Sequence, residues 1–274
     1  MAAVISAHLP RERLLYWGDN ARVPYGTKSP DVVRRYTYEA ASALVERGVK
    51  AIVIACNTAS ASVDLRALSL ELNVPIFGMI EAGRLACQHA LKSIGALDDD
   101  VSSRVIILAT PGTIRSGAYQ RALTDNIPHV RISPIACPIF VPLVEMGWSD
   151  HAITLEIVSA QLRDRVDVIS ELLQEPHDTS MIALLGCTHY PLMASAIERG
   201  LVSVLKRSVR CLDGASSVAR LLESALSRAG LLSDTASSQR HSAHFTDDLR
   251  GASSSALAEH FWRQRGGVGV LDLS

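Results

Sequence analysis

Seven short apolar runs, separated by segments of helical pattern, are the feature that most constrains the fold of this chain. The runs are rich in valine, isoleucine and leucine, and they occupy residues 13–18, 50–55, 74–79, 104–109, 130–135, 181–186 and 209–213. Strands that are apolar at consecutive positions are buried on both faces, as in a parallel sheet that is covered by helices. The sequence therefore predicts an α/β fold with mostly parallel sheets flanked by helices.

The segments between the runs carry apolar residues at intervals of three and four, which predicts helices. These segments are residues 31–46, 114–123, 152–173 and 216–229. Two polar stretches, 93–103 and 233–243, are predicted to be joints. We therefore expect two pseudo-symmetric α/β lobes with the active site in the cleft between them. Residues 1–95 plus 213–274 would form the first lobe, and residues 96–212 the second.

Composition and charge exclude several classes of function. The 274 residues are 48% hydrophobic and carry a formal net charge of −1. There is enough apolar material for a sizeable core, but no basic footprint for nucleic acid and no polybasic membrane patch. No apolar run approaches the ~20 residues of a membrane-spanning helix, and the N-terminus lacks the basic segment of a signal peptide. We expect a cytoplasmic protein with no nucleic-acid or membrane partner.

The five cysteines are widely spaced along the chain, at Cys56, Cys87, Cys137, Cys187 and Cys211. Their odd number and wide spacing predict free thiols in a reducing compartment. No C-x-x-C pair occurs, and the spacing of Cys187 and His189 is not typical of zinc ligands, so no metal is expected. Cys87, Cys137 and Cys211 are interpreted as small buried residues.

Two of the cysteines occur in stretches of the same design. In IVIACNTAS (52–60) and in LLGCTHYPL (184–192), an apolar run ends at a small residue, and a cysteine and polar residues follow. Ligands of open α/β sheets bind beyond the carboxyl ends of the strands. Helix N-terminal amides at that edge favour a bound carboxylate and are expected to lower the pKa of a thiol.

Two thiols that face each other across a cleft predict a specific reaction. A thiolate can remove a proton from one face of a carbon, and a thiol can return a proton to the opposite face, so the configuration inverts without a cofactor. Donors beside the cysteines would stabilise the carbanion-like transition state. Asn57, Thr58 and Thr188 supply such side chains, and His189 is placed to orient or assist Cys187.

These residues belong to longer stretches that together resemble the glutamate racemases of the aspartate/glutamate racemase superfamily. In chain order they are GDNARVPYG (18–26), ACNTASA (55–61), GTIRSGAYQ (112–120), CPIFVPLVE (137–145) and GCTHYPL (186–192). The cysteine motifs alone would also fit aspartate or hydantoin racemases. ARVPYG and GCTHYPL favour the glutamate enzymes.

The resemblance implies cofactor-independent interconversion of L- and D-glutamate, which supplies D-glutamate for peptidoglycan in the bacterial cytoplasm. It implies that Cys56 and Cys187 are the acid/base residues and that Glu145 lies near Cys187. It also implies substrate contacts from a larger set, namely Tyr25, Gly26, Asn57, Thr58, Thr188 and His189. A homodimer is one assembly that the sequence leaves open.

The sequence departs from the family at its N-terminus. Family members open with a strand and an Asp-Ser-Gly-x-Gly-Gly loop, and neither is present here. Residues 1–8 are predicted to begin inside the helix that follows this loop. The missing Asp normally lies near the first cysteine and helps to bind the substrate ammonium. Because every later motif is intact, we expect a start codon assigned too far downstream; the alternative is a truncated product with reduced activity or stability.

Three other functions stay open on the sequence alone. Cys187 and His189 would suit a cysteine hydrolase, but that reading leaves Cys56 without a role. The chain would instead be a binding protein if the missing loop has abolished catalysis. A racemase for another amino acid, such as aspartate, is also compatible with the cysteine motifs.

Overall fold

The computed structural model describes residues 1–96, 103–127, 129–177, 179–234, 241–246 and 271–273. Much of each predicted joint lies outside these residues, namely 97–102 of the first joint and 235–240 of the second. Every pairing between the described strands is parallel. The prediction of an α/β fold with mostly parallel sheets is therefore confirmed.

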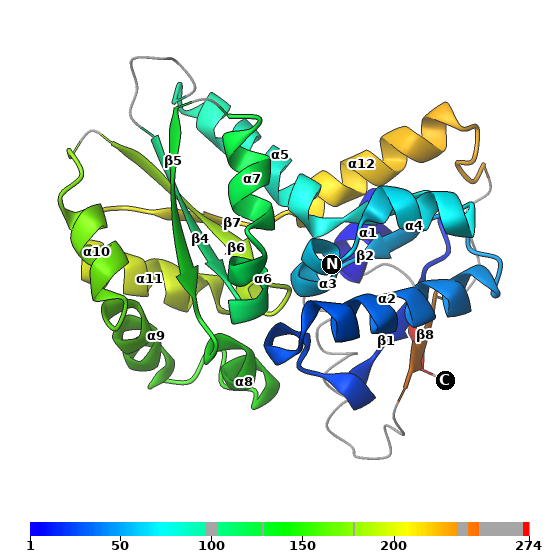
Figure 1. Ribbon diagram of the computed structural model, residues 1–274, viewed down its shortest axis with the longest axis horizontal. Helices are drawn as coiled ribbons and strands as arrows, with labels where there is room; N and C mark the ends of the chain where they lie inside the picture. The colour runs from blue at the N-terminus through cyan, green and yellow to red at the C-terminus, as the bar shows by residue number, and fades with distance from the viewer. Residues whose placement is uncertain (97–102, 128, 178, 235–240, 247–270, 274) are drawn as a thin grey trace.

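A four-stranded sheet with the strand order β5-β4-β6-β7 forms one half of the molecule (Figure 1). Its strands are β4 (Ser103–Ala109), β5 (Val130–Ala136), β6 (Ser180–Gly186) and β7 (Arg210–Leu212). All seven residues of β4 are buried. This burial follows from its central position, since β4 pairs along its whole length with both β5 and β6.

Helices cover both faces of this sheet, and the two faces use alternate residues of β4. Ile106 and Leu108 point into a core built with α8 (Phe140–Glu145), α9 (Thr154–Arg163), α10 (Val166–Leu173) and α11 (Ala194–Leu205). Val105 and Ile107 point into a second core, which includes residues of α5 (Met79–Ser93) and α7 (Ala118–Thr124).

The other half contains a two-stranded sheet of β2 (Ile52–Ile54) and β3 (Ile76–Gly78). Ile52 and Ile54 pack with residues of α2 (Pro30–Val45), α3 (Asn57–Ser62) and α4 (Leu65–Leu72). Val53 and Phe77 pack on the opposite face with α1 (Ala2–His8) and α12 (Ala215–Arg228). The helix predicted at the start of the chain is therefore confirmed.

A third sheet has the order β1-β8-β9, with β1 at Leu15–Gly18, β8 at His241–Phe245 and β9 at Leu271–Leu273. Among the described strands, β1 pairs with β8 and not with β2. Figure 1 shows β1 and β8 side by side below α2. Segments from both ends of the chain thus meet in this sheet.

The seven predicted strands are all present, but two predicted helices are each divided. The helix predicted at 114–123 is interrupted by Gly117, whose positive φ of 64° ends α6 (Pro111–Ser116) before α7 begins. The helix predicted at 152–173 is interrupted near Arg165, whose backbone leaves helical geometry between α9 and α10. The joint predicted at 233–243 is also wrong at its end, because β8 begins at His241.

None of the helices in the described part of the chain is long and apolar enough to cross a membrane.

Candidate active site

Cys56 lies two residues beyond the end of β2 and is the N-cap residue of α3. Its sulfur accepts a hydrogen bond from the backbone N–H of Ala59, with an N–S distance of 3.5 Å. Asn57 and Thr58, in the first turn of α3, are buried. The strand and the helix start therefore hold the thiol at the carboxyl edge of the sheet, as the sequence predicts.

The expectation of a low thiol pKa at this helix start is wrong. Burial raises the pKa of Cys56 to about 11, and the hydrogen bonds from Ala59 and Thr58 lower it by less. The charge of Cys187 also raises the pKa of Cys56. Burial thus has a larger effect than these hydrogen bonds, and Cys56 is a neutral thiol near pH 7.

Cys187 directly follows β6 and is 7% exposed. It is not at a helix start, because a 3₁₀ turn begins only at Tyr190 (η3, Tyr190–Met193) and α11 follows. The short bend after Cys187 turns His189 back toward the thiol, and the sulfur lies 3.8 Å from His189 Nδ1. Thr188, between them, is exposed.

His189 joins Cys187 to Glu145, the last residue of α8. His189 Nε2 lies 2.5 Å from Glu145 Oε1. Burial lowers the pKa of His189, but the hydrogen bonds and the charges of Cys187 and Glu145 outweigh it and raise the pKa to about 10. The hydrogen bond from His189 lowers the pKa of Glu145. A carboxylate, an imidazolium and the Cys187 sulfur therefore lie in a row.

Three buried threonine hydroxyls connect the two sheets beside the cysteines. Thr58 Oγ1 lies 2.9 Å from Thr110 Oγ1 and 3.1 Å from Thr113 Oγ1, and the latter two are 3.1 Å apart. Thr58 is two residues after Cys56, whereas Thr110 immediately follows β4 and caps α6. We call these three residues the threonine cluster.

The threonine cluster links the helix start that follows Cys56 to the carboxyl end of β4. In the register of β4 and β6, Ala109 lies opposite Gly186. Thr110 and Cys187 are the next residues on their strands, so they lie at adjacent strand ends. The effect of the Cys187 charge on the pKa of Cys56 is consistent with this proximity.

The Tyr25–Gly26 segment lies beside Thr110 of the threonine cluster, in a 3₁₀ turn (η2, Tyr25–Thr27). A Cβ atom on Gly26 would lie 2.7 Å from Cβ of Thr110, so only glycine allows the backbone to lie this close to Thr110. Tyr25 packs in the same apolar cluster as Cys56. The structure thus places both residues beside the threonine cluster.

Asp19 holds this segment through its carboxylate. Its carboxylate accepts hydrogen bonds from the Tyr25 hydroxyl, from Arg22 Nε at 2.8 Å and from Thr246 Oγ1 at 2.8 Å. Burial raises the pKa of Asp19, but these hydrogen bonds outweigh it and lower the pKa overall. Thr246 directly follows β8, so a contact across the chain fixes the Tyr25 loop, and no local sequence signal reveals it.

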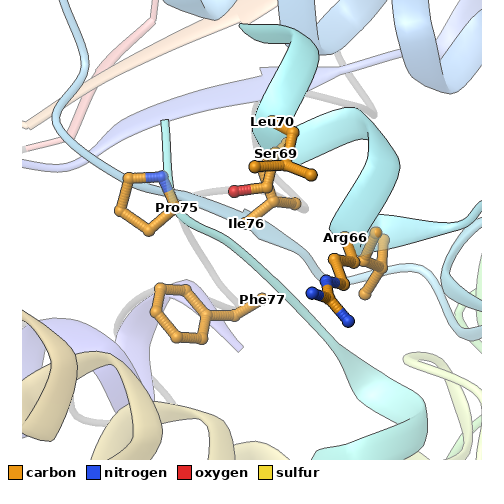
Figure 2. A pocket seen from close by; sticks show the side chains of 7 residues that line it. Arg66, Ser69, Leu70, Pro75, Ile76 and Phe77 are labelled. Atoms are coloured by element: carbon orange, nitrogen blue, oxygen red, sulfur yellow. The ribbon is translucent and has the colours of Figure 1, made fainter. Parts of the chain in front are cut away.

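A groove on another part of the surface lies away from the predicted site residues. It is lined by residues of α4, β3 and the turn between them, namely Leu65, Arg66, Ser69, Leu70, Pro75, Ile76 and Phe77 (Figure 2). Figure 2 shows the side chains of Arg66, Pro75 and Phe77 around it. No predicted site residue lines this groove, so it is not the candidate active site.

In the described part of the chain, no three His, Cys, Asp or Glu side chains are grouped so as to hold a metal ion.

Comparison with known proteins relates this arrangement to one family. The Asp/Glu/Hydantoin racemase family matches residues 1–222. A glutamate racemase of Geobacter metallireducens is 40% identical over 241 residues, which cover 88% of this chain and 80% of that protein. A glutamate racemase of Lysinibacillus sphaericus is 35% identical over 273 residues, covering 100% and 92% of the two chains.

Solved structures agree with these sequence matches. The crystal structure of glutamate racemase from Thermus thermophilus in complex with beta-chloro-D-alanine has a TM-score of 0.73 and 35% identity, covering 99% of this chain and 89% of that one. The glutamate racemase from Francisella tularensis in complex with D-glutamate has a TM-score of 0.78 and 26% identity, covering 99% and 90%. On these matches, the chain belongs to the Asp/Glu/Hydantoin racemase family.

Proposed function

We propose that this protein interconverts L- and D-glutamate without a cofactor, using Cys56 and Cys187 as the two acid/base residues. The observation that supports the proposal is the threonine cluster, which links the helix start that follows Cys56 to the end of β4, and β4 pairs with the strand that precedes Cys187. The substrate is proposed from the relatives, which are named glutamate racemases.

The two cysteines have different surroundings. Cys56, with its pKa raised to about 11, is a thiol near pH 7. The sulfur of Cys187 lies 3.8 Å from Nδ1 of His189, whose pKa is raised to about 10, so the ring beside this cysteine is an imidazolium near pH 7. For one direction of the reaction we assign Cys56 as the proton donor and Cys187 as the base.

In this direction of the reaction, the protons of one turnover balance. The Cys187 thiolate takes the α-proton from one face of glutamate and becomes a thiol. Cys56 gives its proton to the opposite face of the same carbon and becomes a thiolate. The enzyme then holds the opposite pair of charges, which is the form that acts on the other enantiomer. Proton exchange with water restores the first form.

Negative charge develops beside the α-carboxylate in the transition state, and polar groups next to the thiols are proposed to stabilise it. Asn57 and Thr58 follow Cys56, and Thr188 follows Cys187. Donors that are already fixed in place act without reorganisation, which is the largest catalytic contribution in many enzymes. The Tyr25–Gly26 segment is proposed to close the substrate pocket, because it packs between the Cys56 cluster and Thr110.

We propose that residues 1–95 plus 213–274 and residues 96–212 act as two lobes with the substrate between them. We also propose a cytoplasmic location and a role in supplying D-glutamate for peptidoglycan, as the resemblance implies. We propose no nucleic-acid partner. A measurement of the oligomeric state would show whether the protein is a homodimer.

The test is a reaction of the purified chain with L-glutamate and, separately, with D-glutamate in deuterated water. Circular dichroism follows the loss of optical activity, and proton NMR follows the α-hydrogen. The proposal predicts that both enantiomers reach the same racemic mixture and that the product carries deuterium at the α-carbon. A chain that exchanges the α-hydrogen of neither enantiomer would contradict it.

The short distance between Cys187 and His189 also favours one competing reaction, a cysteine hydrolase. A hydrolase forms a covalent acyl adduct on Cys187, which intact-protein mass spectrometry detects after a rapid quench. A racemase forms no adduct at any time during turnover. Deuterium exchange without an adduct therefore separates the two functions.

A further inference from the structure

Tyr119 contacts the residue after Cys56 and the glycine before Cys187, and the proposed mechanism gives it no role. It is on α7, is 1% exposed and is one of the largest fully buried side chains described. Its hydroxyl lies 2.5 Å from Oδ1 of Asn57, the residue directly after Cys56. A tyrosine of the second predicted lobe thus reaches the strand end that carries Cys56.

The ring of Tyr119 packs against two glycines, one of which directly precedes Cys187. A Cβ atom on Gly186 would lie 3.1 Å from Cε2 of Tyr119, and one on Gly83 would lie 2.6 Å from Cε1. Larger residues at these positions would displace the ring. The ring therefore rests on the backbone that positions Cys187, while its hydroxyl holds the side chain next to Cys56.

A chain of buried hydrogen bonds makes the Cys56 end rigid. The Tyr119 hydroxyl is also 3.0 Å from the carbonyl oxygen of Met79. The N–H of Met79 donates to Ser60 Oγ at 3.1 Å, and Ser60 Oγ donates to the carbonyl of Ile54 at 2.8 Å. Ile54 is the last residue of β2, so these contacts fix the turn that carries Cys56 on both sides.

We propose that Tyr119 is a positioning residue that fixes the Cys56 turn relative to the backbone of Cys187, and so sets the separation of the two reacting thiols. This inference rests on the proposed two-cysteine function. It assigns Tyr119 no proton transfer, because its hydroxyl bonds to Asn57 and Met79 within a buried core. The threonine cluster links the same strand ends through different atoms.

The hydroxyl and the ring have separate consequences. Phenylalanine keeps the ring against Gly186 and Gly83 but removes the link to Asn57. Reaction rates depend steeply on such geometry, since a misplacement of 1 Å costs roughly a hundredfold. We therefore expect Tyr119→Phe to lower kcat by about tenfold, with KM within about twofold of the wild type.

Ser103→Ala is the matched control. Ser103 is buried at the opposite end of β4, and its hydroxyl donates to the carbonyl of Ala96 at 2.6 Å. Both variants lose one hydroxyl from a buried hydrogen bond in the same half of the protein, so both should lower the urea midpoint of unfolding. Only Tyr119→Phe should lower kcat.

Two readouts do not depend on racemase activity. Dibromoacetone bridges two thiols across a three-carbon gap, and peptide mass spectrometry measures the yield of the Cys56–Cys187 bridge. Tyr119→Phe should lower this yield several-fold, and Ser103→Ala should leave it unchanged.

In a double-mutant cycle, the urea-midpoint shifts of Tyr119→Phe and Asn57→Ala should be non-additive, whereas those of Ser103→Ala and Asn57→Ala should add.

The outcomes separate the two proposals. If the wild type fails to racemise glutamate but the bridge yield and the cycle behave as expected, the function is wrong and the positioning role stands. If the wild type is active, and Tyr119→Phe matches Ser103→Ala in kcat and in bridge yield, Tyr119 is only a core residue and the inference is overturned. An increase in KM with unchanged kcat would also overturn it.

Discussion

His189 and Glu145 form a hydrogen-bonded pair, with 2.5 Å between Nε2 and Oε1, although 44 residues separate them in the chain. The other ring nitrogen of His189 faces Cys187. Glu145 therefore acts on the thiol through the imidazole, and it holds a proton on His189 well above neutral pH. This relationship predicts the pH dependence of both activity and stability.

Replacing Glu145 by Gln should narrow the pH range of activity. Loss of the carboxylate lowers the pKa of His189, so the imidazolium beside Cys187 disappears at lower pH. We expect the alkaline limb of kcat/KM to move down by about one pH unit or more. The matched control is Glu156→Gln on the exposed side of α9, which makes the same chemical change and should leave the profile unaltered. Identical profiles for the two variants would contradict this role.

The same pair should make stability depend on pH in a defined direction. His189 has a folded-state pKa of about 10, above its ordinary value of 6.5. Its contribution is therefore fully present below about pH 6.5 and is lost as the pH rises through about 10. Glu145 is half-exposed, so solvent screens the pair and the contribution is on the order of 1 kcal/mol.

Urea denaturation across this pH range measures that contribution. The free energy of unfolding of the wild type should fall more steeply between pH 7 and pH 10 than that of Glu145→Gln. Cysteine titration affects both proteins in the same range, so the difference between them isolates the pair. Parallel curves would show that Glu145 and His189 are not coupled in the folded state.

Asp19→Asn should weaken substrate binding by loosening the Tyr25 segment. The amide side chain cannot accept hydrogen bonds from Tyr25, Arg22 and Thr246 as the carboxylate does. We expect kcat/KM to fall by about tenfold, mainly through a higher KM, since each charged hydrogen bond contributes about 1.5–3 kcal/mol. Asp31→Asn, at the exposed start of α2, is the control and should have kcat/KM within about twofold of the wild type. A lower kcat with unchanged KM would contradict a binding role for the loop.

The wild-type protein should give a dibromoacetone bridge between Cys56 and Cys187. The reagent requires two accessible sulfurs about one small molecule apart, and L-glutamate should protect against it. Cys87 and Cys137 are fully buried, so bridges to them should be minor. Monoalkylated Cys56 and Cys187 without a bridged peptide would show that the two thiols do not share an opening.

The central strands β4 and β6 were predictable because burial on both faces leaves a continuous apolar signature. β8 was missed because its residues, His241–Phe245, include two histidines and a serine, and its stability comes from pairing with β1 rather than from its composition. The two long predicted helices are interrupted at Gly117 and near Arg165, because the backbone leaves helical geometry there. The apolar period continues across both breaks, so it carries no signal of them.

The site was only partly visible in the sequence. Cys56 and Cys187 were found because each follows an apolar run in the same way. The roles of Asp19 and Tyr119 depend on partners 227 and 62 residues away along the chain, Thr246 and Asn57. The pKa of Cys56 was predicted in the wrong direction because its burial depends on tertiary packing, which a local helix argument does not include.

Loss of either thiol gives the most direct test of the central claim. In Cys56→Ser and Cys187→Ser, racemisation should be nearly abolished, but the remaining cysteine can still exchange the α-hydrogen on its own face. In deuterated water, NMR should therefore show residual exchange of one enantiomer in the first variant and of the opposite enantiomer in the second. If both variants exchange the same enantiomer, or if either still racemises glutamate at the wild-type rate, the two thiols do not act on opposite faces of one carbon.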